Sequence, residues 1–194
     1  MKGPVVFIDL ETGGLAPHHA EIQVAAIAVE DWREVEVFER KIVFDPKEQA
    51  DPEVLAMNSY DAETWAREAV SESSVVADLG HFLRAYSVVS MVSQRGKPYK
   101  VARLAGHNAL GFDCPRLAAM FKRHGAFLPA AIYQPLDTLQ LALWECACHG
   151  TQASNYQLGT LCQMLGIPLG AEGHDALSDV RATIALARKL LEPA

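Results

Sequence analysis

The fold is decided by VVFIDLE (residues 5–11), in which four consecutive apolar residues are followed by an Asp, a Leu and a Glu. A strand that is covered on both faces of a sheet has such a continuous apolar run, so we expect these residues to form a central strand. IQVAAIAVE (22–30) and EVEVFERKIVF (34–44) have the composition of two further strands, separated by a short turn near residues 31–34. Three successive strands joined in this way predict an antiparallel meander.

The rest of the chain alternates between helical and strand-like patterns. Apolar residues recur with a helical period from Val75 to Tyr86, and the polar segment SQRGKPYK (93–100) ends this pattern. Residues 101–107 are expected to form a strand, and IYQPLD (132–137) a short strand at most. Helices are expected over 114–125, 138–148, 156–165 and 175–191. This order predicts an α/β fold with a mixed sheet and helices on its faces.

Length and hydropathy indicate one compact domain. The chain has 194 residues, of which 50% are hydrophobic, enough for a sizeable core in a single domain over residues 1–194. Its longest apolar run, VAAIAV (24–29), is far shorter than the roughly 20 residues that a membrane span needs. The N-terminal sequence reaches a charge too early for a signal peptide, so we expect no membrane association and a cytoplasmic location.

Acidic residues stand at three places where strands end or helices begin. Because residues two apart in a strand point to the same face, Asp9 and Glu11 project together from the end of the first strand. Two like charges there are costly to bury without a cation, so the pair is either a metal site or a solvated strand end. Asp113 could equally be the N-cap of the helix that follows it. Asp179 borders the apolar face of the last helix, although it could also be solvated.

Three segments together resemble the motifs of the DEDDh-type (DnaQ-like) 3′-5′ exonucleases, which include the proofreading subunit of bacterial replicative polymerase, RNase T and oligoribonuclease. The motifs are DLETGGL (9–15), HNALGFDCPRL (107–117) and HDALSD (174–179), in the family's order and over nearly the whole chain. The resemblance implies a ribonuclease-H-like fold. Its five-stranded mixed sheet would have antiparallel strands 1–3, then parallel strands, with helices on both faces.

The resemblance also implies the roles of individual residues. Two divalent cations, Mg²⁺ or Mn²⁺, would be held by the four carboxylates of Asp9, Glu11, Asp113 and Asp179. His174 would be the general base that distinguishes the histidine branch of this family from its tyrosine branch.

The same resemblance implies contacts to the substrate. Thr12 and Leu15 would meet the terminal nucleotide, with Leu15 wedged against a base, and Asn108 would position the strand. A buried loop Leu and a turn-forming Asn are the alternative interpretations of the last two. This chain departs from many relatives by having Gly13 in place of Thr and Gln23 in place of Glu, and by one additional residue in the second motif. None of these differences falls on a metal ligand.

The charge balance limits how the protein can hold nucleic acid. Acidic residues outnumber basic ones by 24 to 17, a formal net charge of −7, which disfavours a protein that coats long nucleic acid. Two bound divalent cations would bring this to about −3, which suits an enzyme that grips a strand end. The basic residues at 95, 97, 100 and 103 belong either to a flap that touches phosphate or to a solvated hairpin.

Four cysteines, at positions 114, 146, 148 and 162, do not follow the pairing pattern of a disulfide scaffold. CACH (146–149) suggests a zinc site, but it lacks the usual second pair of ligands. Ordinary buried or half-buried thiols are therefore expected.

The implied function is a metal-dependent 3′-to-5′ exonuclease that releases nucleoside 5′-monophosphates from single-stranded ends by two-metal-ion hydrolysis. DNA is expected ahead of RNA. An RNA-trimming or oligoribonuclease-like enzyme is the alternative within the class, because both polymers share the phosphodiester. A non-catalytic nucleic-acid-binding or polymerase-accessory module is the alternative from another class. Association with a polymerase, or as a homodimer, is compatible with the sequence.

Overall fold

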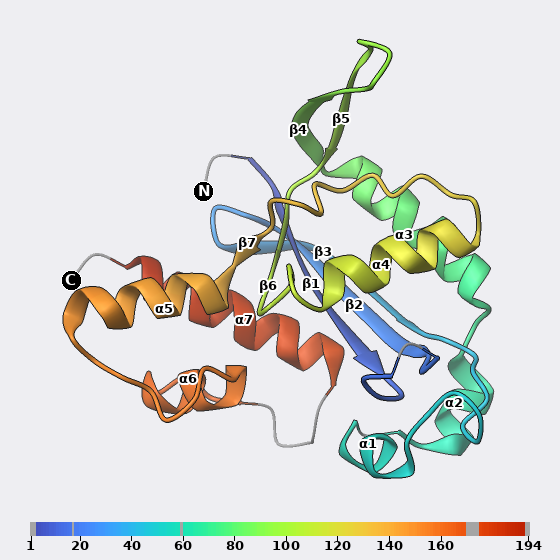
Figure 1. The fold of residues 1–194 in the computed structure, drawn as a ribbon, viewed down its shortest axis with the longest axis horizontal. Coiled ribbons are helices and arrows are strands. Elements are labelled where there is room, and N and C mark those ends of the chain that lie inside the picture. Colours follow the sequence, from blue (N-terminus) through green and yellow to red (C-terminus); the bar gives the residue numbers. More distant parts are fainter. Residues whose placement is uncertain (1–2, 17, 59, 170–174, 193–194) are drawn as a thin grey trace.

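A five-stranded mixed sheet forms the centre of the computed structural model, which describes residues 3–16, 18–58, 60–169 and 175–192 (Figure 1). The strand order is β3-β2-β1-β6-β7. Antiparallel pairs join β1 to β2 and β2 to β3, whereas β6 runs parallel to both β1 and β7. The bounds are β1 (Val5–Thr12), β2 (Glu21–Glu30), β3 (Arg33–Lys41), β6 (Leu104–Gly106) and β7 (Leu136–Asp137).

Helices cover both faces of this sheet because β1 and β2 are apolar on both sides. Val6, Ile8 and Leu10 face α3 (Glu72–Ala85) and α4 (Asp113–Arg123). Val5 and Phe7 point to the opposite face, where α7 (Ala176–Leu191) packs. The expected ribonuclease-H-like arrangement is thus confirmed: an antiparallel meander, parallel strands after it, and helices on both sides.

Smaller helices complete the two ends of the molecule. Beyond α7 lie α5 (Thr138–His149) and α6 (Leu158–Met164), which share a small apolar cluster with it. Near the C-terminal end of β1 lie α1 (Pro52–Met57) and α2 (Ala62–Glu68), each with an Asp side chain as N-cap. Among the described residues, none of the helices is long and apolar enough to span a membrane.

Several segments differ from the sequence-based expectations. Residues 87–92, expected to lie in or after a helix, form β4 (Ser87–Val92), which pairs with β5 (Pro98–Ala102) in a separate hairpin. The strand expected over 101–107 is therefore divided between two sheets. The helices α1 and α2 were not expected, and the strand expected over 132–137 is limited to Leu136 and Asp137. Both termini of the hairpin emerge from the body, and its tip projects beyond it (Figure 1).

Candidate active site

Asp9 and Glu11 lie on the face of β1 that is covered by α7, two and four residues beyond Phe7. The alternation of side chains along a strand places both carboxylates on this face. Glu11 is only 7% exposed and Asp9 is half-buried. The interpretation of a solvated strand end therefore does not fit these two residues.

Asp179 reaches the same place from α7. It lies in the first turn of this helix, and its backbone N–H donates to the carbonyl of Asp175 over 2.9 Å. Carboxylate oxygens of Asp9, Glu11 and Asp179 all lie within 4.8 Å of one another. The structure thus brings together three acids from positions that are up to 170 residues apart in the chain.

Asp113 lies beside these three residues, at the first position of α4, and is 2% exposed. Its Oδ1 accepts a hydrogen bond from the backbone N–H of Leu10 over 3.0 Å, which turns the carboxylate toward β1. The N-cap position belongs to Phe112. Asp113 is thus tied to the strand between Asp9 and Glu11, and the N-cap interpretation is wrong.

Burial and mutual repulsion shift the pKa values of these acids upward. The pKa of Asp9 is raised well above its usual range by burial and then by the charges of Asp113, Glu11 and Asp179. Burial, followed by Asp179, Asp175 and Asp113, raises the pKa of Glu11 to about 8. Burial also raises the pKa of Asp113 to about 7, although backbone hydrogen bonds oppose this shift. Such a cluster is stabilised most effectively by cations.

The donor set fits hard divalent cations. Carboxylate oxygens are the ligands that Mg²⁺ and Mn²⁺ prefer, whereas no cysteine belongs to this cluster. The charges that raise the pKa of Asp9 and of Glu11 are all carboxylates. Positive charge at this place is therefore most simply supplied by bound metal.

His174 lies outside the described residues, so its proposed role as general base rests on the sequence motif. Its neighbour Asp175 is well placed: the side chain of Asp175 caps α7 by accepting the N–H of Ser178 over 3.0 Å. The amide of Gln23 donates to the same carboxylate over 3.0 Å and to Glu39 over 2.9 Å. Gln23 is almost completely buried.

A cleft of about 1190 Å³ opens over the carboxylates. Its walls come from the C-terminal end of β1, the N-terminal ends of α4 and α7, and α6 with the loop before it. All four acids line this cleft, three of them from β1 and α4 and Asp179 from α7. His107, Asn108 and Tyr156 also belong to its walls. A space of this size can hold more than one nucleotide.

The three expected substrate contacts occupy different environments. The hydroxyl of Thr12 is buried and donates to the carbonyl of Gly14 over 3.1 Å, so its hydrogen bond is made within the loop after β1. Leu15 is 83% exposed, so the interpretation of a buried loop Leu is wrong. Asn108 lines the cleft and also forms a turn, with a φ of 59° and its backbone N–H donating to Asp137 over 2.9 Å.

The loop after β1 is held closely, which explains why Gly occupies position 13. A Cβ at Gly13 would lie 2.5 Å from the carbonyl oxygen of Gln49. From α4, the guanidinium of Arg116 donates to the carbonyl of Gly14 over 2.9 Å and forms an ion pair with buried Glu21 at 3.4 Å. Thr, which many relatives have at position 13, cannot be accommodated without moving this loop.

His107 is a cleft residue for which the sequence predicted no separate role. Its Nδ1 lies 2.9 Å from the hydroxyl of Thr138, and its Nε2 lies 2.9 Å from the carbonyl of Tyr156. Burial lowers the pKa of His107, opposed by the contact with Tyr156. The ring therefore connects β6 to the segments around α5 and α6. The sequence signal that could have indicated its place in the cleft is its position as the first residue of the second motif.

Two remaining expectations concern the cysteines and the basic segment. Cys114, Cys146 and Cys162 are buried and Cys148 is exposed. Within the described ranges, no group of three potential metal ligands includes any of them. Of the basic residues, Arg95, Lys97 and Lys100 lie on the tip and second strand of the β4–β5 hairpin and Arg103 follows β5, all with exposed side chains, which is compatible with both a flap and a solvated hairpin.

Comparisons with known proteins agree with this geometry. The chain matches the RNase T family model, described as exonuclease, over residues 6–187. A structure of exonuclease I aligns with a TM-score of 0.75 at 19% identity, over 97% of this chain and 41% of that one. E. coli exonuclease I in complex with a dT13 oligonucleotide aligns with a TM-score of 0.74 at 20% sequence identity, over 98% of this chain and 41% of that one. The zinc-bound E. coli enzyme with single-stranded DNA aligns with a TM-score of 0.73 at 19% identity, over 98% of this chain and 40% of that one. A search of curated sequences gave no significant match.

This chain spans about two fifths of the length of the exonuclease I chains, so the structural likeness concerns the fold of their matching part. The family model covers almost the whole chain and includes all three motifs. The chain belongs to the RNase T exonuclease family, that is, to the DEDDh-type (DnaQ-like) exonucleases of the ribonuclease-H-like superfamily.

Proposed function

We propose that this chain is a metal-dependent exonuclease that shortens a single strand, DNA in preference to RNA, from its 3′ end and releases nucleoside 5′-monophosphates. The observation that carries this proposal is the convergence of Asp9, Glu11 and Asp179 within 4.8 Å, beside the buried Asp113. Membership of an exonuclease family supports the reaction class. The preference for DNA is supported by the shared fold with exonuclease I, which has been solved with dT13.

Asp9, Glu11, Asp113 and Asp179 would hold two divalent cations, Mg²⁺ or Mn²⁺. Bound there, the cations supply Lewis-acid stabilisation of the charge that develops at phosphorus and on the leaving oxygen. The chain's own contribution is rigidity, because all four acids lie on regular elements and Asp113 is also fixed to Leu10 by a hydrogen bond. Fixed ligands keep the reacting groups aligned.

His174 is the proposed general base. An imidazole with a pKa near 6.5 can take a proton from the attacking water at neutral pH. Leu15, with its exposed side chain, would pack against the terminal base, and Asn108 would contact the strand from the wall of the cleft. Thr12 would act through the loop that its hydroxyl stabilises.

Product analysis tests this proposal. Single-stranded DNA and RNA of one sequence, each labelled at either the 5′ or the 3′ end, are incubated with Mg²⁺ or Mn²⁺. Shortening from the 3′ end gives a ladder from 5′-labelled strands and labelled mononucleotide from 3′-labelled strands from the beginning. The reverse pattern would overturn the polarity, and faster loss of RNA would assign the enzyme to RNA.

A further inference from the structure

The basic residues of this acidic protein are concentrated in one part of the chain. Residues 79–136 contain eight Lys or Arg side chains and a single acidic one, Asp113, whereas the whole chain has a net charge of −7. The basic residues of this segment are Arg84, Arg95, Lys97, Lys100, Arg103, Arg116, Lys122 and Arg123. Arg116 and Arg123 form ion pairs with Glu21. In the described part of the chain, Lys97, Lys100 and Lys122 form none.

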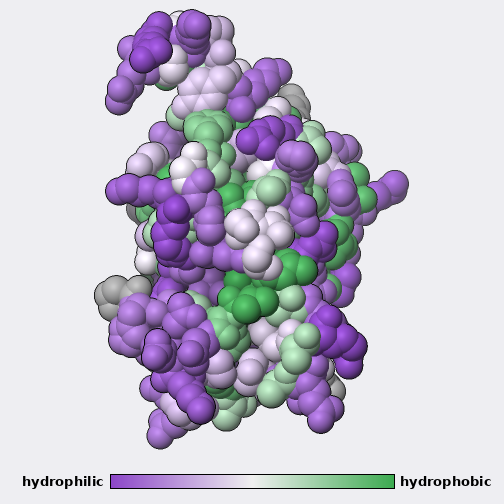
Figure 2. Space-filling model, turned by 90° about the vertical axis from the view of Figure 1, so that its right-hand side faces the viewer, coloured by the Kyte–Doolittle hydropathy of each residue, from purple (hydrophilic) through white to green (hydrophobic). Residues whose placement is uncertain are grey.

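The β4–β5 hairpin carries part of this charge away from the body of the molecule. Figure 2 shows it as a projection with a hydrophilic tip at the top of the molecule. Arg95, Lys97 and Lys100 are all exposed on it. An anionic partner can therefore approach the hairpin without displacing any part of the protein.

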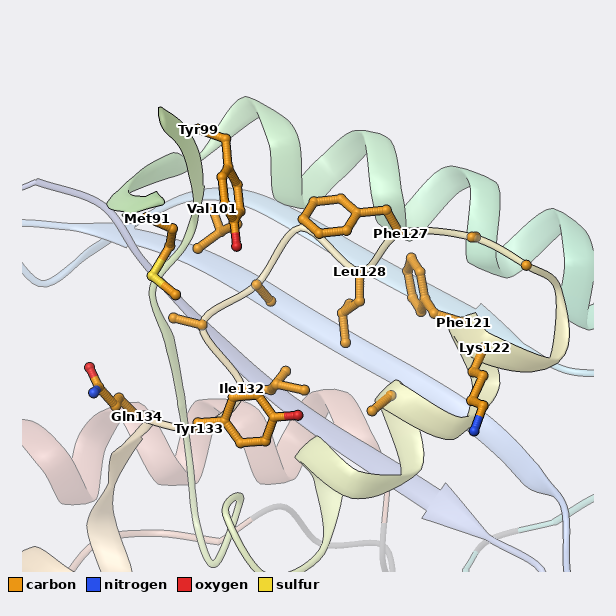
Figure 3. A pocket seen from close by; sticks show the side chains of 15 residues that line it. Met91, Tyr99, Val101, Phe121, Lys122, Phe127, Leu128, Ile132, Tyr133 and Gln134 are labelled. Carbon is orange, nitrogen blue, oxygen red and sulfur yellow. The ribbon is translucent and has the colours of Figure 1, made fainter. Parts of the chain in front are cut away.

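An apolar groove of about 600 Å³ lies at the foot of the hairpin, between it, the C-terminal half of α4 and residues 125–134 (Figure 3). Tyr99 of the hairpin and Phe127 stand edge to face, with ring centroids 5.8 Å apart. Phe127 is 57% exposed and Tyr133, which also lines the groove, is 84% exposed. Large aromatic side chains with this much open surface are available for contact with a partner.

The groove is connected to the catalytic cleft through α4. This helix places Asp113 in the cleft, while Ala118, Phe121 and Lys122 line the groove. With a rise of 1.5 Å per residue, the two ends are roughly 14 Å apart along the helix axis. Phe112 of the cleft, Pro115, and Lys122 of the groove are not buried and lie along one side of the helix by their spacing. A strand that leaves the cleft along this face reaches the groove within a few nucleotides.

We propose that the groove binds the single strand a few nucleotides behind its 3′ end. Bases would stack on Tyr99, Phe127 and Tyr133, and phosphates would lie near Lys122, which lines the same groove. The exposed Lys97 and Lys100 of the hairpin add to the positive field around the groove. Aromatic side chains beside basic ones form the usual surface for sequence-independent binding of single strands. An acidic, partly apolar peptide would match the same charges, but the link along α4 to the cleft favours the strand. The proposal deepens the proposed function and rests on it.

Fluorescence anisotropy in EDTA, which prevents hydrolysis, tests the groove separately from catalysis. The probes are a fluorescein-labelled trithymidylate and an oligothymidylate of about 15 nucleotides. Replacing both Phe127 and Tyr133 with Ala should weaken binding of the long strand about tenfold or more and leave the trinucleotide unchanged. The matched control is Trp144→Ala, because Trp144 is 71% exposed on α5, away from the groove.

The charge at the groove has its own readout. Lys122→Ala should lower the slope of log affinity against log salt by about 0.7, the contribution of each phosphate contact to a single strand. Lys189→Ala on α7 removes the same charge elsewhere and should leave the slope unchanged.

Equal binding of the long strand by the groove variants and the wild type would overturn the proposal. The proposal would also be overturned if the strand bound in the cleft alone and an acidic peptide bound at the groove in its place. Turnover of the trinucleotide with Mn²⁺ separates the two proposals. If the wild type hydrolyses no strand, the proposed function fails, whereas loss of long-strand affinity in the groove variants tests the groove in either case.

Discussion

The side-chain amide of Gln23 donates a hydrogen bond to the carboxylate of Asp175 over 3.0 Å and so connects β2 to the first turn of α7. Gln23 stands directly opposite Glu11 in the β1–β2 ladder. Asp175 in turn precedes Asp179 by one helical turn and directly follows His174 in the chain. Because Asp9, Glu11 and Asp179 repel one another, a contact that fixes the start of α7 helps to hold the ligand set together.

Gln23→Glu should therefore weaken metal binding. The substitution places a carboxylate between Asp175 and Glu39, the two carboxylates that now accept from the amide. We expect a loss of roughly 1 to 3 kcal/mol in the free energy of unfolding and a higher Kd for Mn²⁺ by calorimetry. Gln152→Glu, the same change at an exposed loop position, is the control. Unchanged Mn²⁺ affinity would show that this contact does not position the ligands.

Stability without metal should fall as the pH rises. The pKa of Glu11 is raised from its ordinary value of 4.5 to about 8. Between these values the folded protein retains a proton that the unfolded chain has released, so the free energy of unfolding decreases with pH. Glu11→Gln should reduce this slope in EDTA, and Mg²⁺ should stabilise the wild type more at pH 8 than at pH 5. If thermal melts gave the same dependence of stability on pH for both proteins, the raised pKa of Glu11 would be refuted.

His174→Ala should slow turnover by something like 10²- to 10⁴-fold, the usual contribution of a general base. In the wild type, the rate should rise through about pH 6 to 8 as the imidazole loses its proton. The variant should lose this limb of the profile and keep its Mn²⁺ affinity. A variant with a near-normal rate and the same limb would show that His174 is not the base.

Leu15→Ala should raise KM several-fold with little effect on Tm, because the side chain is 83% exposed and contributes little to the core. Leu191→Ala, at an exposed position near the end of α7, provides the comparison. An unchanged KM would remove Leu15 from the substrate contacts.

The regular elements of the sheet and its main helices could be predicted because their patterns are strong. The apolar run before Asp9 predicted a central strand, and the periodic segment around Val180 predicted the last helix. The hairpin strand β4 was missed because the apolar residues after Tyr86 continue a helical pattern without a break, and only pairing with β5 makes them a strand. The helices α1 and α2 are too short to produce a clear period.

The site itself could be predicted only in part. The spacing of Asp9 and Glu11 indicated a shared face, but nothing local connects them with Asp113 or Asp179, because the approach of β1, α4 and α7 is a tertiary event. Their grouping followed from resemblance to a family. The link from Gln23 to Asp175, across 152 residues, has no signal in the sequence.

The central claim is that divalent cations on these carboxylates drive removal of nucleotides from a 3′ end. It is tested most directly by following a 5′-labelled single strand with Mn²⁺, using the wild type and Asp113→Ala in parallel, with Tm as a check on folding. We expect stepwise shortening by the wild type, its loss in EDTA, and no detectable shortening by a folded Asp113→Ala protein. Activity of the variant within about tenfold of the wild type, or hydrolysis that persists after chelation, would contradict the account.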